Sequence, residues 1–191
     1  MDVFEYLSVL VSVILGLGIT HLLAGASKMV HHRDTMRLYL PHIVWTVNLL
    51  LLILAIWWGM FWWSTLHDWF FFQFLFIVTY AICLFLSAGM LYPWSIPDDF
   101  DFERHFMYNR RWFFGFVMAG WIIDIPETLL KGDIGLREVP VLYFVFAGWN
   151  IASCLLGILF EQRRVQTVLS LQWFVVVAAY LGVTTLAEIA A

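Results

Sequence analysis

The residues best suited to chemistry are two acidic side chains within one apolar segment. Asp124 and Glu127 stand three residues apart near the end of residues 112–130, which are otherwise mainly Phe, Val, Met, Ala, Trp and Ile. On a helix, this spacing places both carboxylates on one face. An ionised carboxylate in hydrocarbon costs on the order of 3 kcal/mol, so Asp124 requires pairing, water or a bound proton. We interpret Asp124 as the ion-binding or proton-binding acid of an intramembrane site.

Pro126 lies between the two acids and supports this interpretation. Proline has no backbone N–H, so the carbonyl of Ile122 loses its helical partner. An unpaired carbonyl beside a carboxylate within the membrane would be a stopping point for a proton or a small cation. The alternative is a structural Asp124 that hydrogen-bonds across the helix bundle. Candidate partners for that bond are His21, Asn150 and Tyr180.

Further polar residues are candidates for an ion or proton pathway that would include Asp124 and Glu127. Glu5 and Glu188 stand near the ends of the first and last apolar segments, which would make one mouth acidic, unless both are simply interfacial. His21 lies in the opposite half of the first segment and would act as the inner relay. Asn48 and Asn150 stand near the middle of the second and fifth segments. Such amides more commonly form hydrogen bonds between helices than bind ligands.

His21 has a second interpretation, as an axial ligand of haem b. Gly18 and Gly25 flank it on one helical face and would leave space for a porphyrin. His42 is the candidate second ligand, because bis-histidine ligation requires two facing imidazoles. His42 stands close to the interface, however, and a lone intramembrane histidine is more often hydrogen-bonded to a neighbouring helix. We therefore predict no cofactor and keep haem b as the alternative.

The elements that must position these residues are six apolar helices. The chain has 191 residues, of which 63% are hydrophobic and 13% charged. Soluble domains are about 45–50% apolar and about 25% charged, so the bilayer is the solvent here. Each apolar segment has the ~20 residues needed to cross it, and none alternates as a β-barrel strand would. We predict an all-α, polytopic membrane protein with helices over residues 3–30, 38–63, 69–92, 112–130, 139–160 and 165–189.

Basic residues predict the orientation of these helices. The connections after the first, third and fifth helices hold most of the basic residues, and short basic connections face the cytoplasm. We therefore predict a protein of the inner (plasma) membrane with both termini outward, on the periplasmic side. The residues on the predicted inner side are Lys28, Arg33, Arg37, Arg104, Arg110, Arg111, Arg163 and Arg164. Those on the predicted outer side are Lys131 and Arg137.

Weak internal matches suggest that three helices are repeated. Asn48 matches Asn150, and Gln73 matches Gln172, at offsets close to 100 residues. A three-helix unit reverses its orientation when it is copied, so the copies would form a 3+3 inverted repeat, an arrangement typical of transporters and channels. The predicted divisions are a first repeat over 1–92, a cytoplasmic loop over 93–111 that could form an amphipathic interfacial helix, and a second repeat over 112–191.

Signatures of enzymes and of nucleic-acid binding are missing from the sequence. It contains no HExxH, GxSxG, P-loop or dinucleotide-binding pattern, so we lean against an enzyme. Cys83 and Cys154 stand in separate apolar segments and do not form a metal-binding motif. Residues 16–21 and 110–115 resemble small bacterial membrane proteins without an assigned activity. That resemblance implies no function.

The leading prediction is a small integral membrane transporter or channel, linked to protons or cations. Its partners would be the lipid bilayer and a proton or small cation, without nucleic acid, and self-association as a homo-oligomer is left open. A non-catalytic membrane subunit or signalling partner is the first alternative, and a haem-bearing electron-transfer protein is the second. The predicted pathway residues are Asp124, Glu127, His21, Glu5, Asn48 and Asn150.

Overall fold

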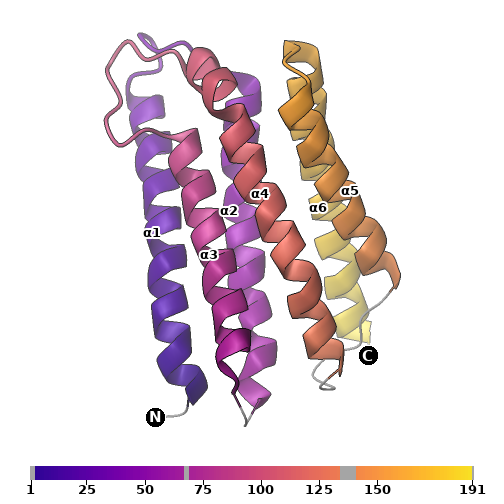
Figure 1. Ribbon diagram of the computed structural model, residues 1–191. Coiled ribbons are helices and arrows are strands. Elements are labelled where there is room, and N and C mark those ends of the chain that lie inside the picture. The colour runs from indigo at the N-terminus through magenta and orange to yellow at the C-terminus, as the bar shows by residue number, and fades with distance from the viewer. Residues whose placement is uncertain (1–2, 67–68, 134–140, 191) are drawn as a thin grey trace.

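The fold is a bundle of six long α-helices. The computed structural model describes residues 3–66, 69–133 and 141–190, and these ranges contain no β-strand (Figure 1). All six helices are long and apolar enough to cross a membrane, which confirms the prediction of an all-helical, multi-pass membrane protein. The helices are α1 (Val3–His31), α2 (Leu40–Gly59), the short 3₁₀ helix η1 (Met60–Thr65), α3 (Phe71–Leu91), α4 (Phe102–Asp133), α5 (Val141–Leu159) and α6 (Arg163–Ala190).

Local sequence explains several helix ends. Pro41 stands in the first turn of α2, where its missing N–H has no helical partner to lose. The side-chain Oε1 of Gln73 accepts the backbone N–H of Phe70 at 2.8 Å, which satisfies a free donor at the start of α3. Pro93 follows directly after the C-cap residue Tyr92, and a proline cannot continue a helix.

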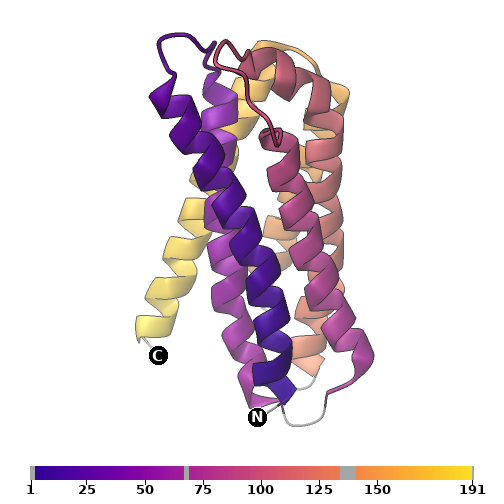
Figure 2. The same ribbon diagram turned by 90° about the vertical axis from the view of Figure 1, so that its left-hand side faces the viewer.

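The helices pack unequally. Helix α3 lies between α1 and α4 and packs along both, and α5 packs against the other side of α4. Helix α6 packs on α2 and then diverges from it toward its C-terminal end (Figure 2). Where α2, α4 and α6 meet, the indole of Trp45 contacts Phe113, Phe114 and Trp173 at ring-centroid distances of 5.2, 5.2 and 5.3 Å. This aromatic cluster fills the interior between the two ends of the bundle.

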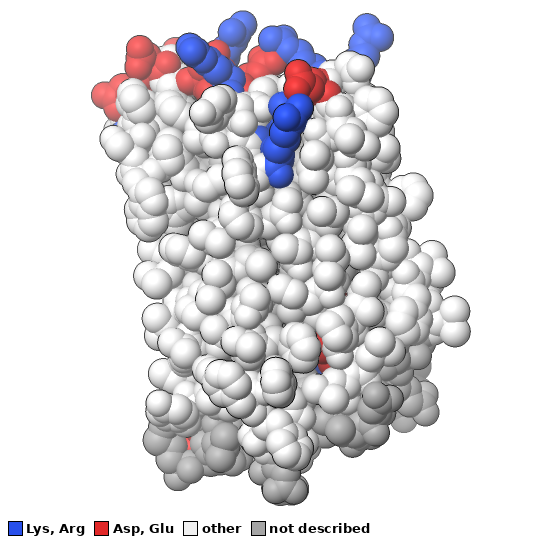
Figure 3. All heavy atoms as spheres, in the orientation of Figure 1, with Lys and Arg blue, Asp and Glu red and all other residues white. Residues whose placement is uncertain are grey.

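The two ends of the bundle differ in charge. We call the end that holds the α1–α2, α3–α4 and α5–α6 connections the basic end, and the opposite end, where α1 begins and α6 finishes, the terminal end (Figure 1). Lysine, arginine and acidic side chains gather at the basic end, whereas the face below it shows almost no Lys, Arg, Asp or Glu (Figure 3). This separation agrees with the grouping of basic residues read from the sequence. Which end faces the cytoplasm remains a prediction.

Helix α4 is longer than the sequence predicted. It starts at Phe102 rather than at Trp112, so the interfacial helix expected within residues 93–111 is instead the first turns of α4. Phe102 and Phe106 are buried and do not rest on the bilayer. Their rings pack on Tyr92 and Tyr39, at centroid distances of 5.9 and 5.8 Å. Contact with these tyrosines, which adjoin α3 and α2, extends the helix beyond the apolar span.

The structure does not confirm the 3+3 inverted repeat. Helix α1 packs along α3, but the corresponding helices α4 and α6 make no comparable contact in the described ranges. The matched amides also differ in role. Asn48 donates across the bundle to the carbonyl of Ser170 at 3.0 Å, whereas Asn150 donates to the carbonyl of Phe146 in its own helix at 2.7 Å. Apolar helices align easily in sequence, and packing depends on contacts that such an alignment does not contain.

Candidate intramembrane acidic site

Asp124 lies half-buried on the side of α4 that faces α5. The hydroxyl of Tyr143, on α5, donates to Oδ2 of Asp124 at 2.6 Å. Tyr80, on α3, approaches the same region because its ring packs over Gly120, one turn before Asp124. A Cβ atom at Gly120 would lie 2.9 Å from Cε2 of Tyr80, so this close approach requires glycine. Asp124 therefore has a phenol donor from α5 and an aromatic neighbour from α3 near it.

Glu127 is buried in an ion pair that the sequence analysis missed. Its Oε1 accepts the indole N–H of Trp63 at 2.7 Å and lies 2.7 Å from Nζ of Lys131. Only 8% of the Glu127 side chain and 11% of the Lys131 side chain are exposed. The Lys131 ammonium also lies 5.4 Å from the centroid of the Trp63 ring and 3.5 Å from the carbonyl of Gly59. Trp63 thus contacts both members of the pair.

The two acidic side chains of the site have different kinds of partner. Two carboxylates and one ammonium stand within two turns of α4, and the ammonium lies on Glu127. Asp124 is instead bonded by a neutral phenol, whose O–H stabilises a carboxylate and whose oxygen can accept from a protonated acid. The two carboxylates therefore have different kinds of partner, an ammonium for Glu127 and a phenol for Asp124.

The structure separates Asp124 from the carbonyl that Pro126 frees. Ile122 and Pro126 both lie on the exposed side of α4. Asp124 follows Ile122 by two residues, a rotation of about 200° around the helix. The expected stopping point, with carboxylate and free carbonyl together, is therefore not formed. Proline does not break α4, which continues to Asp133.

The two candidate haem ligands bind backbone carbonyls at the end of α3. Nε2 of His21 lies 2.7 Å from the carbonyl of Tyr92, and Nε2 of the buried His42 lies 2.9 Å from the carbonyl of Leu91. The Tyr92 ring packs against His42 at 4.6 Å and fills the space that Gly25 leaves. The volume expected for a porphyrin at Gly25 is therefore taken by Tyr92. Haem b remains an untested alternative to which this geometry adds no support.

The other predicted pathway residues lie apart from Asp124. Glu5 is exposed in the first turn of α1, while Asn48 and Asn150 are buried in other helix contacts. Next to Gly18, three residues before His21, the nearest atoms belong to Ile53 and Phe85. The Ile53 side chain and the Phe85 backbone therefore adjoin α1 on the terminal-end side of His21.

Three residues of the site escaped the sequence analysis as partners of the acids. The predicted fourth helix ends at residue 130, so Lys131 falls outside it, and the sequence does not link Trp63 or Tyr143 to the site. One local signal was present, because Lys131 follows Glu127 by four residues, the spacing at which opposite charges meet on a helix. The contacts of Trp63 and Tyr143 join distant parts of the chain, and the spacing of residues in the sequence does not predict such contacts.

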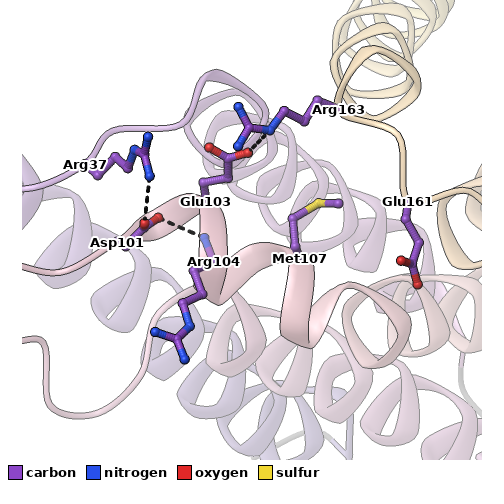
Figure 4. A pocket seen from close by; sticks show the side chains of 7 residues that line it. All are labelled: Arg37, Asp101, Glu103, Arg104, Met107, Glu161 and Arg163. Carbon is purple, nitrogen blue, oxygen red and sulfur yellow. Dashed lines mark hydrogen bonds and ion pairs between the residues drawn. The ribbon is translucent and has the colours of Figure 1, made fainter.

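A separate polar pocket of about 370 Å³ lies at the basic end (Figure 4). Opposite charges pair around it: Arg37 lies 3.4 Å from Asp101, and Arg163 pairs with Glu103. Glu161, in the α5–α6 connection, pairs with Arg110 of α4. The Arg37–Asp101 pair joins the α1–α2 connection to the start of α4, and the other two pairs hold the start of α6 and the α5–α6 connection against α4, which is a structural role.

Comparison of the chain with protein-family models, with curated proteins and with solved structures finds no match.

Proposed function

We propose that this integral membrane protein moves protons or small cations, with Asp124 as the acid that exchanges them. The observation that carries the proposal is a half-buried carboxylate inside a membrane-spanning helix: the hydroxyl of Tyr143, on the neighbouring helix α5, donates to Oδ2 of Asp124 at 2.6 Å. Ionisable groups within membrane spans are costly and usually mark ion or proton pathways. The buried Glu127–Lys131 pair stands one turn further along α4, and Asp124 is the acid that we propose to exchange the proton or cation.

The packing favours a transporter over an open channel. Ile53 and Phe85 lie against α1 between the terminal end and His21, and the aromatic cluster around Trp45 fills the neighbouring interior. An ion that enters at the terminal end therefore meets packed apolar side chains beyond Asp124. Passage requires a change of conformation, in which His21 would act as the relay near the basic end.

The same packing supports a second candidate, a non-catalytic membrane subunit or signalling partner. In that case the bond from Tyr143 to Asp124 would serve only to join α5 to α4. The two candidates differ in one measurable property, because only the first predicts ion movement.

Ion flux in proteoliposomes tests the proposal. Wild-type protein is expected to move protons, sodium or potassium in a pH-dependent manner. Asp124→Asn keeps the shape of the side chain and removes its titration, so flux should fall to the level of empty vesicles. Asp34→Asn is the matched control, since the Asp34 side chain is 84% exposed at the basic end, and its flux should be unchanged.

Two outcomes would contradict this proposal. Wild-type vesicles that show no flux under any gradient would favour the subunit alternative. Flux that persists in Asp124→Asn would retain transport but remove Asp124 from it. Melting temperatures of all variants in detergent separate a lost function from a lost fold.

A further inference from the structure

A cavity of about 250 Å³ lies between α1 and the segment that follows α3. It stands at the basic end, far along α1 from the acidic site. From α1, it is lined by His21 and Lys28; from the facing segment, by Tyr92, Trp94 and Ile96. The proposed function uses this cavity only through His21.

The groups around this cavity can bind an anion. The ammonium of Lys28 donates to the carbonyl of Ile96 and lies 3.8 Å from the exposed Asp98. An ammonium has three donors, so one remains for a further acceptor. The Trp94 ring, which is 82% exposed, lies 4.7 Å from the ring of His21. Tryptophan is typical of the membrane–water interface, where a lipid headgroup would lie.

An apolar stripe leads along α1 to the cavity. Residues three or four positions apart share a helical face. His21 and Lys28 therefore lie on the same face as Leu10, Val13 and Leu17. These three side chains are 46%, 54% and 55% exposed, so nothing in the described part of the chain covers them. The face thus presents a hydrocarbon-compatible stripe that ends in a cationic, tryptophan-bordered cavity.

We propose that this face binds one anionic phospholipid. Its phosphate occupies the cavity beside His21 and accepts from the Lys28 ammonium, and an acyl chain lies along Leu17, Val13 and Leu10. Basic pockets at this level of a membrane protein suit anionic headgroups. The stripe distinguishes a lipid from a free phosphate, because only a lipid gains from the apolar contacts. Asp98 competes with the phosphate for Lys28.

Native mass spectrometry of the purified protein tests this proposal by counting retained phosphatidylglycerol and phosphatidylcholine. Wild-type protein should retain one phosphatidylglycerol in preference to phosphatidylcholine. Lys28→Gln should weaken this binding about five-fold, the factor expected for one basic residue near an anionic lipid. Asp98→Asn should strengthen it, because the competing carboxylate is removed. Arg33→Gln is the matched control and should bind as wild type, since its exposed side chain does not line the cavity.

A separate experiment distinguishes a phospholipid from a soluble phosphate as the bound anion. Leu17→Ser should weaken phosphatidylglycerol binding, and soluble glycerol phosphate at equal concentration should not displace the lipid. Displacement by glycerol phosphate, together with an unchanged Leu17→Ser variant, would overturn the lipid assignment in favour of a soluble anion. Equal retention of both lipids, or equal losses in Lys28→Gln and Arg33→Gln, would overturn the site itself. Flux through Asp124 plays no part in these outcomes.

Discussion

The ammonium of Lys131 lies 2.7 Å from the carboxylate of Glu127, one turn earlier on α4, and both side chains are almost entirely buried. Neither charge would be tolerated alone at this position, because breaking a buried pair leaves an uncompensated charge. The pair therefore explains how α4 keeps two charged side chains near one end of a membrane span.

The first prediction tests this pair by a double-mutant cycle. Glu127→Gln and Lys131→Met should each lower the free energy of unfolding by about 3–5 kcal/mol, because each leaves the other charge buried. The double variant should be more stable than either single variant. Denaturation of the protein in detergent micelles measures the three differences. If the single losses simply add, the two side chains do not interact.

The second prediction concerns the fit of Tyr92 against α1. Gly25→Ala should destabilise the protein by about 1–3 kcal/mol, since the added methyl group would overlap the buried Tyr92 ring. Gly16→Ala is the control, because no atom lies within 4 Å of its added Cβ. It should be neutral or stabilising by about 0.5–1 kcal/mol, as expected for replacing a helical glycine. Equal melting temperatures for the two variants would refute the contact.

The third prediction is a dependence of stability on pH. The backbone N–H of Arg104 bonds to Oδ1 of Asp101 at 2.9 Å, and this bond, together with Arg37, lowers the pKa of the Asp101 carboxyl below its ordinary value. A lowered pKa means that the folded protein favours the carboxylate. The stabilisation is therefore present above about pH 4, the range of an unperturbed aspartate, and is lost as the pH falls through the folded pKa.

Thermal unfolding between pH 3 and pH 6 measures this effect. Asp101→Asn should retain the capping bond to Arg104 but lose this part of the pH dependence, whereas Asp101→Ala should lose the cap as well, at a cost of about 1 kcal/mol. A wild-type curve that matches the curve of Asp101→Asn at every pH would exclude the role of the Asp101 charge.

The fourth prediction fixes the orientation. Because the eight basic residues of the α1–α2, α3–α4 and α5–α6 regions lie at one end, that end should face the cytoplasm. Lys131, one of the two basic residues counted against this bias, belongs to α4 and is paired within the bundle. A reporter that is active only in the periplasm should give signal when fused to either terminus. Strong activity of a cytoplasmic reporter at both termini would reverse the orientation.

The fifth prediction separates haem from the other candidates. His21 and His42 direct Nε2 to backbone carbonyls, and Tyr92 fills the space beside Gly25. Purified protein should therefore have no Soret band. A stoichiometric haem that disappears in His21→Ala, but not in His31→Ala, would instead establish electron transfer as the leading function.

The sequence by itself determined that the surroundings of this protein are a lipid bilayer and that its secondary structure is helical. Runs of about 20 apolar residues can satisfy their backbone hydrogen bonds in a bilayer only as helices, so six such runs predict six spanning helices. Asp124 and Glu127 were identifiable as site candidates for the same reason, since a charge in such a run is costly. The grouping of basic residues at one end also follows from chain order alone, because successive helices reverse direction.

Only the tertiary structure decided which residues meet. Tyr143 reaches Asp124 from another helix, and Trp63 reaches Glu127 from more than sixty positions away in the chain. Helical periodicity gives the face on which a side chain lies, but not the helix that this face contacts. In the bundle, the Tyr92 ring occupies the space beside Gly25, and α6 packs on α2 rather than on α4. Both outcomes depend on how bulky side chains share the interior, which is a property of the assembled bundle.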